Sequence, residues 1–216
     1  MSTYDAWEEM RRQKFESELR AEINEKKHKR LETAIERCGL NLALKEKTFD
    51  SYVATEDWQK IAKASCQKYA ENPERWLLVS GPSGCGKTHL CTAIVKSILD
   101  RGIPVWYMLY REEINRLKPI DGVEPDEREA KMWTFKTCQV LYIDDLFKGG
   151  ASKADIKVMF ELIDYRYRTN KTTIVSTELT MRQLVEVDAA IAGRIAEGAK
   201  KVLIKHEKDR NYRIEL

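Results

Sequence analysis

Short runs of apolar residues, many of them β-branched or aromatic, recur along the chain and alternate with longer segments of helical periodicity. Runs of this kind are typical of buried strands, and apolar positions three and four apart are typical of helices. The predicted strands are residues 76–79, 105–110, 139–145, 172–177 and 201–205. The predicted helices are residues 56–71, 88–99, 111–118, 127–137, 153–169, 181–186 and 188–197. A chain of 216 residues is long enough for one α/β domain of this kind plus an appendage.

Two of these helices have a clear apolar face. The inward residues are predicted to be Trp58, Ile61, Ala62, Cys66 and Tyr69 in the first, and Ile156, Met159, Phe160, Ile163 and Tyr167 in the second. Thr180 is expected to cap the helix that follows it, because a threonine oxygen accepts from a free backbone N–H there. Gly39 is expected to end a preceding helix, and residues 40–53 to form an irregular connector.

Residues 4–37 contain neither proline nor glycine, and charges of both signs alternate along good helix formers. They predict a helical arm of one or two helices. Its apolar stripe is thin and consists of Trp7, Phe15, Leu19, Ile23, Leu31, Ile35 and Cys38. Two interpretations stay open: the stripe packs on the chain's own domain, or it docks on a partner protein.

Composition and charge narrow the class of protein. Hydrophobic residues make up 43% and charged residues 34%, which is typical of a soluble globular protein. The net charge is only +3, so nucleic-acid binding would have to come from local patches. The five cysteines form no Cys-x-x-Cys pair, which argues against a zinc site and for reduced thiols. No stretch has membrane-spanning length or the plan of a signal peptide, so a cytoplasmic location without membrane contact is expected.

One motif carries specific chemistry. Residues 81–88 read Gly-Pro-Ser-Gly-Cys-Gly-Lys-Thr and lie between a predicted strand and a predicted helix, which is the context of a G-x-x-x-x-G-K-[ST] phosphate loop. Glycines let backbone N–H groups turn toward one anion, and the helix N-terminus adds partial positive charge. The predicted nucleotide-binding residues are Gly81, Pro82, Ser83, Gly84, Cys85, Gly86, Lys87, Thr88 and His89. The alternative is a tight turn that binds no ligand.

Within this motif two residues have distinct roles. Lys87 would reach the β- and γ-phosphates and act in catalysis, and the Thr88 hydroxyl would sit on Mg²⁺. The strand at 139–145 ends in Asp144 and Asp145, at the carboxyl edge where ligands bind in open parallel sheets. Asp144 would hold the water shell of the metal. Asp145 would orient or deprotonate an attacking water.

Several segments together resemble a known family. They are the phosphate loop, Val-Leu-Tyr-Ile-Asp-Asp-Leu-Phe-Lys at 140–148, Ile-Val-Ser-Thr-Glu-Leu-Thr at 174–180 and Ala-Gly-Arg-Ile at 192–195. They are similar to the DnaC/DnaI-like AAA+ replicative helicase loaders, most of all to the short phage and prophage forms, over roughly residues 38–216. The IstB-type transposition ATPases share the same core. The resemblance implies a P-loop domain with a five-stranded parallel sheet, without a C-terminal helical lid, that binds ATP and, after hydrolysis, ADP at a subunit boundary.

The resemblance also implies roles for individual residues. Arg194 falls where the family carries an arginine finger for the γ-phosphate of the neighbouring subunit. Thr177 and Glu178 fall where it senses that phosphate, although asparagine is usual at the second position. Phe49 matches a dipeptide near the nucleotide base. Asp145 stands where most AAA+ ATPases have glutamate, and the shorter carboxylate predicts slow hydrolysis suited to a switch.

The same resemblance predicts partners. Residues 1–47 would form the arm that contacts a DnaB-type replicative helicase, and residues 48–216 the ATPase domain, which would self-associate through its ATP sites. Single-stranded DNA would run past the assembled subunits. Candidate DNA contacts are Lys148, Lys153, Tyr165, Arg166 and Arg168, for which a solvated helix face is the ordinary alternative.

Two other functions remain open at this point. A transposition ATPase would bind duplex rather than single-stranded DNA and would have no affinity for a helicase. A small-molecule phosphotransferase could use the same phosphate loop, but no Arg-rich lid follows the third predicted strand, and paired strand-end acids suit water activation better than acceptor binding.

Overall fold

A computed structural model describes residues 39–119 and 125–204, together with Arg11, Arg12, Phe15, Glu16, Glu18, Thr33 and Glu36. Its centre is a five-stranded sheet in the order β2-β3-β4-β1-β5, in which every neighbouring pair is parallel. The strands are β1 (Trp76–Ser80), β2 (Val105–Leu109), β3 (Val140–Asp144), β4 (Thr172–Thr177) and β5 (Ala199–Leu203). The predicted α/β fold with a five-stranded parallel sheet is therefore confirmed.

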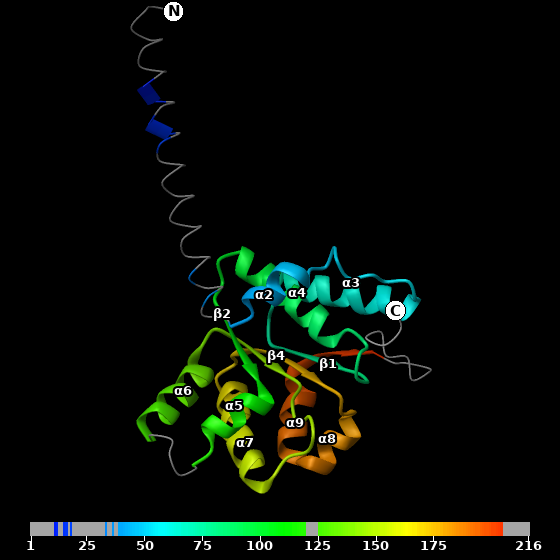
Figure 1. Cartoon of the computed structure of the whole chain (residues 1–216), viewed down its shortest axis with the longest axis vertical. Coiled ribbons are helices and arrows are strands. Elements are labelled where there is room, and N and C mark those ends of the chain that lie inside the picture. The colour runs from blue at the N-terminus through cyan, green and yellow to red at the C-terminus, as the bar shows by residue number, and fades with distance from the viewer. Residues whose placement is uncertain are drawn as a thin grey trace, which may run out of the picture.

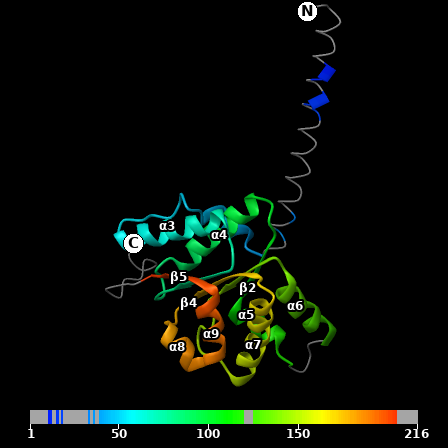
Figure 2. The ribbon, with the colours of Figure 1, turned by 180° about the vertical axis from the view of Figure 1, so that it is seen from behind.

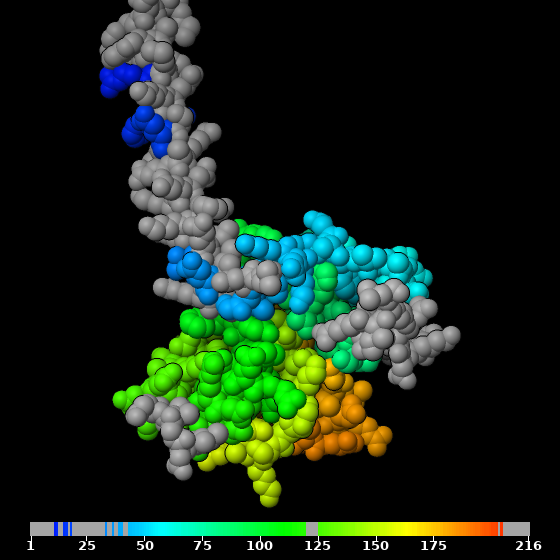
Figure 3. All heavy atoms as spheres, in the orientation of Figure 1, coloured from blue at the N-terminus to red at the C-terminus, as the bar shows by residue number. Residues whose placement is uncertain are grey.

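Helices cover both faces of this sheet (Figures 1 and 2). One layer consists of α2 (Asn41–Glu46), α3 (Asp57–Glu71) and α4 (Lys87–Asp100). The other consists of α5 (Tyr110–Leu117), α6 (Pro125–Thr137), α7 (Lys153–Arg168), α8 (Met181–Val187) and α9 (Ala189–Gly198). The space-filling view shows α2 and α3, in blue and cyan, above the green, yellow and orange elements of the second layer (Figure 3).

Side chains along each strand alternate between the two faces of the sheet, and this divides the core into two parts. In β1, Leu77 and Val79 pack with α3 and α4, whereas Trp76 and Leu78 pack with the second helix layer. Because successive side chains of a strand point to opposite faces, a strand covered on both faces buries all its side chains and is mostly apolar. All five residues of β1 and all five of β3 are buried accordingly.

Local signals in the sequence fix where several helices begin. Thr180 caps α8 as predicted: its side chain accepts from the backbone N–H of Gln183, whose side chain accepts in return from the N–H of Thr180. Ser152 and Asp155 form the same reciprocal pair at the start of α7. Each such capping box satisfies backbone donors that a helix end leaves free.

Two details of the first helix layer differ from the sequence-based expectation. The connector at 40–53 contains the helix α2, because Leu40 and Leu44 are four residues apart and both are buried against the core shared with α4. In α3, Ile61 is exposed, whereas Gln59 is buried. The Gln59 side-chain oxygen accepts from the backbone N–H groups of Thr55 and Glu56. These hydrogen bonds at the start of α3 hold the polar side chain of Gln59 in a buried position.

Arg166 was expected to contact DNA, and the structure corrects this. Its side chain is fully buried, and its guanidinium donates to the carbonyls of Phe135, Cys138 and Thr172 and to the hydroxyl of Thr173. Phe135 lies in the last turn of α6, where carbonyl groups lack helical partners and carry partial negative charge. Arg166 therefore joins α7 to the end of α6 and the start of β4.

Some expectations fall outside the described residues. They concern most of the arm at 4–37 with its apolar stripe, Cys38, the end of the last predicted strand at Lys205, and any lid beyond residue 204. Phe15 of the stripe is described and is exposed. Within the part of the chain that the structure describes, no helix is both long enough and apolar enough to cross a membrane.

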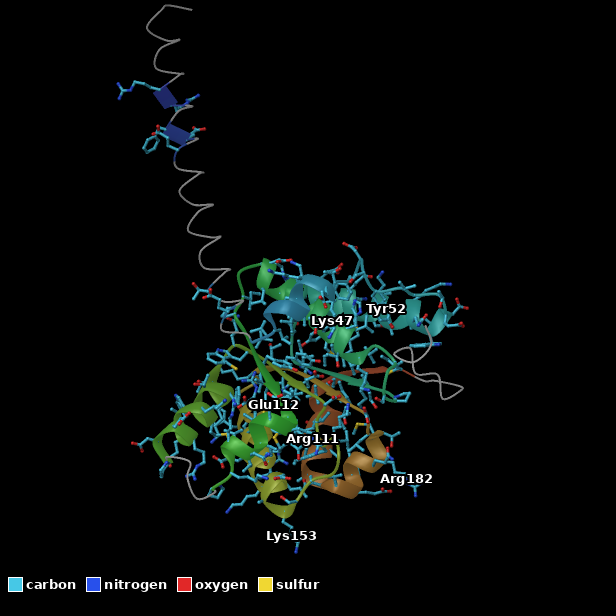
Figure 4. The ribbon with its side chains drawn as sticks, in the orientation of Figure 1. Lys47, Tyr52, Arg111, Glu112, Lys153 and Arg182 are labelled. Atoms are coloured by element: carbon cyan, nitrogen blue, oxygen red, sulfur yellow. The ribbon has the colours of Figure 1, made fainter. Side chains whose placement is uncertain are left out.

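Replacing Arg166 with methionine should lower the free energy of unfolding by about 3 kcal/mol, because buried carbonyl groups lose their charged donor. Arg182 offers a matched control: it lies on α8, where Figure 4 labels it, and its side chain is 91% exposed. Arg182→Met should change stability by less than about 0.5 kcal/mol. Chemical denaturation measures both, and equal stabilities of the two variants would contradict the assigned role.

Candidate functional site

The phosphate-loop motif forms the connection between β1 and α4. Gly84 and Gly86 have φ angles of +77° and +90°, in the left-handed region that favours glycine. A side chain at Gly86 would also meet the ring of Tyr52, since an added Cβ lies 2.9 Å from Tyr52 Cε2. The helix α4 begins directly after it, at Lys87. The loop thus presents backbone N–H groups and a helix N-terminus together.

The Lys87 side chain is folded back over this loop. It is buried, and its Nζ donates to the carbonyl oxygen of Pro82 at 2.8 Å. Two other residues of the loop, Gly81 and Cys85, lie against each other: Cys85 is buried, and a Cβ at Gly81 would come within 2.9 Å of its Sγ. Burial raises the pKa of the Cys85 thiol, so this group stays protonated at neutral pH.

A hollow of about 210 Å³ opens in front of the loop. It is lined by Lys47, Ser83, Gly84, Gly86, Lys87, Thr88, His89, Asp145, Lys148 and Glu178. Eight of these ten were predicted as nucleotide-site residues, and the fold brings them together from the loop, the start of α4 and the segments that follow β3 and β4. Its lining of glycines, cations and a helix N-terminus has the donors that a polyphosphate requires.

Asp144 is held by hydroxyl groups from several elements. Its carboxylate accepts from Tyr142 at 2.6 Å, from Tyr107 at 3.1 Å and from Thr88 at 3.4 Å, and also from the hydroxyl of Ser176. Burial, followed by the nearby charges of Cys91 and Asp144, raises the pKa of the Tyr142 hydroxyl, which therefore remains a donor. A threonine hydroxyl beside a buried carboxylate fits Mg²⁺, which takes few protein ligands besides phosphate oxygens and water.

Asp145 lies just beyond β3 with φ at +55°. Its backbone N–H donates to the hydroxyl of Ser176, and its carboxylate pairs with Lys148 at 2.8 Å. Lys148 also pairs with Glu178, at 3.0 Å. Although burial alone would raise it, the ammonium of Lys148 lowers the pKa of the Glu178 carboxyl. The hydrogen bond to Asp145 raises the pKa of Lys148.

The connector before α3 lies against the start of α4. The ring of His89 bonds through Nε2 to the carbonyl oxygen of Thr48 at 2.9 Å and contacts Tyr52 edge to face. Burial lowers the pKa of this histidine, so it is neutral at pH 7. Phe49 packs partly buried against the core and does not line the hollow. Lys47, which lines it from the end of α2, is drawn with Tyr52 in Figure 4.

Thr177 and Arg194, which were also predicted for the site, do not line the hollow. Thr177 is buried and donates its hydroxyl to the carbonyl of Leu146, so its side chain links β4 to the loop after β3. Arg194, on α9, pairs with Asp164 at 2.6 Å and lies over the ring of Phe160, 4.7 Å from its centroid. Arg194 is not part of the hollow of its own chain.

With this geometry established, comparison with known proteins identifies the family. Residues 6–213 match the family described as IstB-like ATP binding protein. The chain belongs to that family. Phage-like element PBSX protein XkdC of Bacillus subtilis (strain 168) is 36% identical to this IstB-like chain over 159 residues, which are 71% of the chain and 54% of XkdC. The chain spans about half the length of the curated relatives it matches, XkdC and the B. subtilis protein YqaM.

Solved structures support the same fold. The IstB-like chain superposes on the DnaC helicase loader with a TM-score of 0.65 and 26% identity, over 74% of this chain and 97% of that one. AMPPCP-bound DnaA from Aquifex aeolicus shares the fold, with a TM-score of 0.64 and 19% identity, over 78% of this chain and 52% of that one. The predicted resemblance is thus confirmed at the level of the family.

Sequence reasoning missed several residues of the IstB-like site. Tyr107, Tyr142 and Ser176 were not predicted, and Lys148 was assigned to DNA rather than to the two acids it pairs with. One signal for Tyr142 was present: it lies two residues before Asp144 in the same strand, and so on the same face. Tyr107 and Ser176 come from neighbouring strands, and their approach depends on the register of the sheet.

Replacing Gly86 with alanine should destabilise the protein through two effects: the left-handed backbone and the contact with Tyr52. Gly102 isolates the first effect, because its φ is +78° and an added Cβ would meet nothing within 4 Å. Gly102→Ala should cost about 1 kcal/mol, and Gly86→Ala about 2 kcal/mol more. Urea denaturation compares the two, and equal losses would contradict the packing of Tyr52 on the phosphate loop.

Proposed function

We propose that the protein is an ATP-dependent loader that places a DnaB-type replicative helicase on single-stranded DNA. The main observation is the hollow that the glycine loop, Lys87, Thr88 and Asp145 line, with the buried carboxylate of Asp144 bonded to the Thr88 hydroxyl. Family membership supports ATP as the nucleotide. Similarity across almost the whole of the DnaC helicase loader structure supports the loader function rather than another ATP-dependent task.

The residues around the hollow would divide the binding of ATP between them. Backbone N–H groups of the loop would hold the phosphates, and Lys87 would exchange the carbonyl of Pro82 for the β- and γ-phosphates. Thr88 and Asp144 would hold Mg²⁺, which neutralises charge on the phosphate oxygens when bound. Because hydroxyl groups already orient Asp144, its carboxylate would need little rearrangement to hold the water shell of the metal.

Hydrolysis would depend on Asp145 as the group that orients or deprotonates water. Aspartate is one methylene shorter than the glutamate usual here, and its carboxylate is engaged by Lys148 at 2.8 Å. Both features keep the acid away from an attacking water, so hydrolysis is slow. A slow ATPase suits a switch that holds a loaded state for a long time.

Arg194 would complete the site of a neighbouring subunit. Arg194 lies outside the hollow of its own chain, which supports a role at the site of a neighbouring subunit. Its side chain is 26% exposed, so a neighbouring subunit can reach it. Asp164 and Phe160 hold the guanidinium in a defined place on α9. A planar guanidinium presents several donors to the phosphoryl oxygens on which charge develops. Self-association through ATP sites follows from this role.

The helicase and DNA contacts are assigned to other parts of the chain. The arm, with its predicted boundary at residue 47, would bind the helicase through its apolar stripe. For single-stranded DNA, Lys153 and Arg168 are exposed, and Tyr165 contacts the exposed ring of Trp133 and the ammonium of Lys136. Aromatic rings beside cations are suited to stacked bases and their phosphates.

A mixing experiment tests the shared site. Lys87→Ala should lose ATP binding, and Arg194→Ala should bind ATP but hydrolyse it about a thousandfold more slowly. An equal mixture of the two should recover about a quarter of the wild-type rate, because one junction in four then pairs an intact phosphate loop with an intact Arg194. Arg182→Ala is the control for loss of a surface arginine. A mixture as inactive as its components would exclude the role of Arg194 in trans.

A binding experiment tests the loader function. The full chain should capture a DnaB-type helicase and should prefer single-stranded to duplex DNA. The double variant Trp7→Glu/Leu19→Glu should no longer bind the helicase, because charge on the apolar stripe opposes docking. Its ATP binding should be unchanged. Glu16→Gln serves as the control. Binding to duplex DNA without any affinity for the helicase would instead indicate a transposition ATPase. Transfer of phosphate to a metabolite would indicate a phosphotransferase.

A further inference from the structure

The loop after β3 has a shape that is costly for its residues. Asp145 and Phe147 have positive φ angles of 55° and 59°, and Gly149 and Gly150 follow with 79° and 93°. A left-handed conformation is tolerated by aspartate but is unusual for phenylalanine, and costs on the order of 1–3 kcal/mol. Such a conformation persists only where the surrounding structure fixes it. The loop is therefore held in place by its neighbours.

Packing and hydrogen bonds provide that support. Phe147 is buried and contacts the ring of Tyr110, and Leu146 is buried beside it. The backbone of Leu146 is bonded on both sides to the end of β4, through the carbonyl of Ser176 and the hydroxyl of Thr177. After Asp145, Lys148 is the next residue of this loop that lines the hollow.

The Lys148 ammonium lies between two acids. It is 2.8 Å from Asp145 Oδ2 and 3.0 Å from Glu178 Oε1, and the side chains of all three are no more than 32% exposed. Glu178 and Ser83 of the phosphate loop line the same hollow. The carboxylate of Glu178 thus holds a cation beside the phosphate loop, as an oxygen-bearing anion bound in the hollow would.

We propose that Lys148 is the residue that distinguishes ATP from ADP, and that Glu178 is a positioning residue that holds Lys148 until the γ-phosphate takes its place. The inference rests on the proposed function, since it concerns the same hollow. It assigns to a lysine and its carboxylate partner the recognition of the terminal phosphate that the family resemblance assigns to Thr177 and Glu178. Thr177 does not reach the hollow, because its hydroxyl is bonded within the protein.

Two different roles for Lys148 fit its contacts less well. A DNA contact would need an exposed ammonium, whereas two carboxylates engage this one. A purely structural ion pair would not need to lie beside the phosphate loop, and the loop after β3 is already anchored by Leu146 and Phe147. Proximity to Lys87 within one hollow is what favours a phosphate ligand.

Calorimetric titration of the full chain with AMPPNP and with ADP, each with Mg²⁺, tests the inference. Lys148→Met should weaken AMPPNP binding about tenfold and leave ADP binding within about twofold, because one charged contact to the third phosphate is lost. Lys148→Arg should keep most of the preference, because the positive charge remains. Lys157→Met, which removes an exposed lysine of α7, should match the wild type for both nucleotides.

Glu178→Gln gives the sharper result, because it should change affinity in the opposite direction. Without the competing carboxylate, Lys148 is free for the γ-phosphate, so AMPPNP should bind about threefold more tightly. The affinity for ADP should not change. A gain in affinity cannot come from misfolding. Lys148→Met binding both nucleotides in the wild-type ratio, or losing both equally, would overturn the inference while leaving the proposed function intact. A wild-type chain that binds neither nucleotide would overturn both.

Discussion

The geometry of the site depends on one buried charge, the carboxylate of Asp144. A carboxylate removed from water is costly unless hydrogen bonds replace its hydration. Here four hydroxyl groups replace that hydration. They belong to Tyr107 of β2, Tyr142 of β3, Ser176 of β4 and Thr88 of α4. Satisfying this carboxylate therefore requires the correct order of three strands and the correct position of the phosphate-loop helix. One side chain connects the sheet to the nucleotide hollow.

Most of the architecture could be predicted from local pattern, and the shared contacts could not. The strands β1 and β3 are apolar up to their last residue, β4 is rich in β-branched residues, and the phosphate loop is defined by residues adjacent in sequence, so all of these are visible without the fold. The partners of Asp144 are not, because Tyr107 and Ser176 meet it only through strand register. The helix α2 was missed for a similar reason: a six-residue segment is helical here because Leu40 and Leu44 are buried against the core around α4.

Charged residues show most clearly where sequence reasoning reaches its limit. Arg166 and Lys148 look like surface cations in the sequence, and a charged residue is exposed in most proteins. The fold buries the first against the carbonyls at the end of α6 and places the second between two acids. Burial of a charge depends on partners that can be distant in sequence, here 31 and 28 residues away for the carbonyls of Phe135 and Cys138 that Arg166 contacts. The type of a charged residue alone therefore says little about the role of that residue.

The three cations of the proposed catalytic site share one property: each already has a partner within the protein. Lys87 donates to Pro82, Lys148 pairs with Asp145 and Glu178, and Arg194 pairs with Asp164. If the proposed roles hold, binding of a nucleotide is an exchange of partners, in which phosphate oxygens replace protein oxygens around the same cations. Such an exchange gives less affinity than contact with free cations, but it couples the nucleotide to the loop after β3 and to α9, which carry two of these cations. That coupling is what a nucleotide-dependent switch requires.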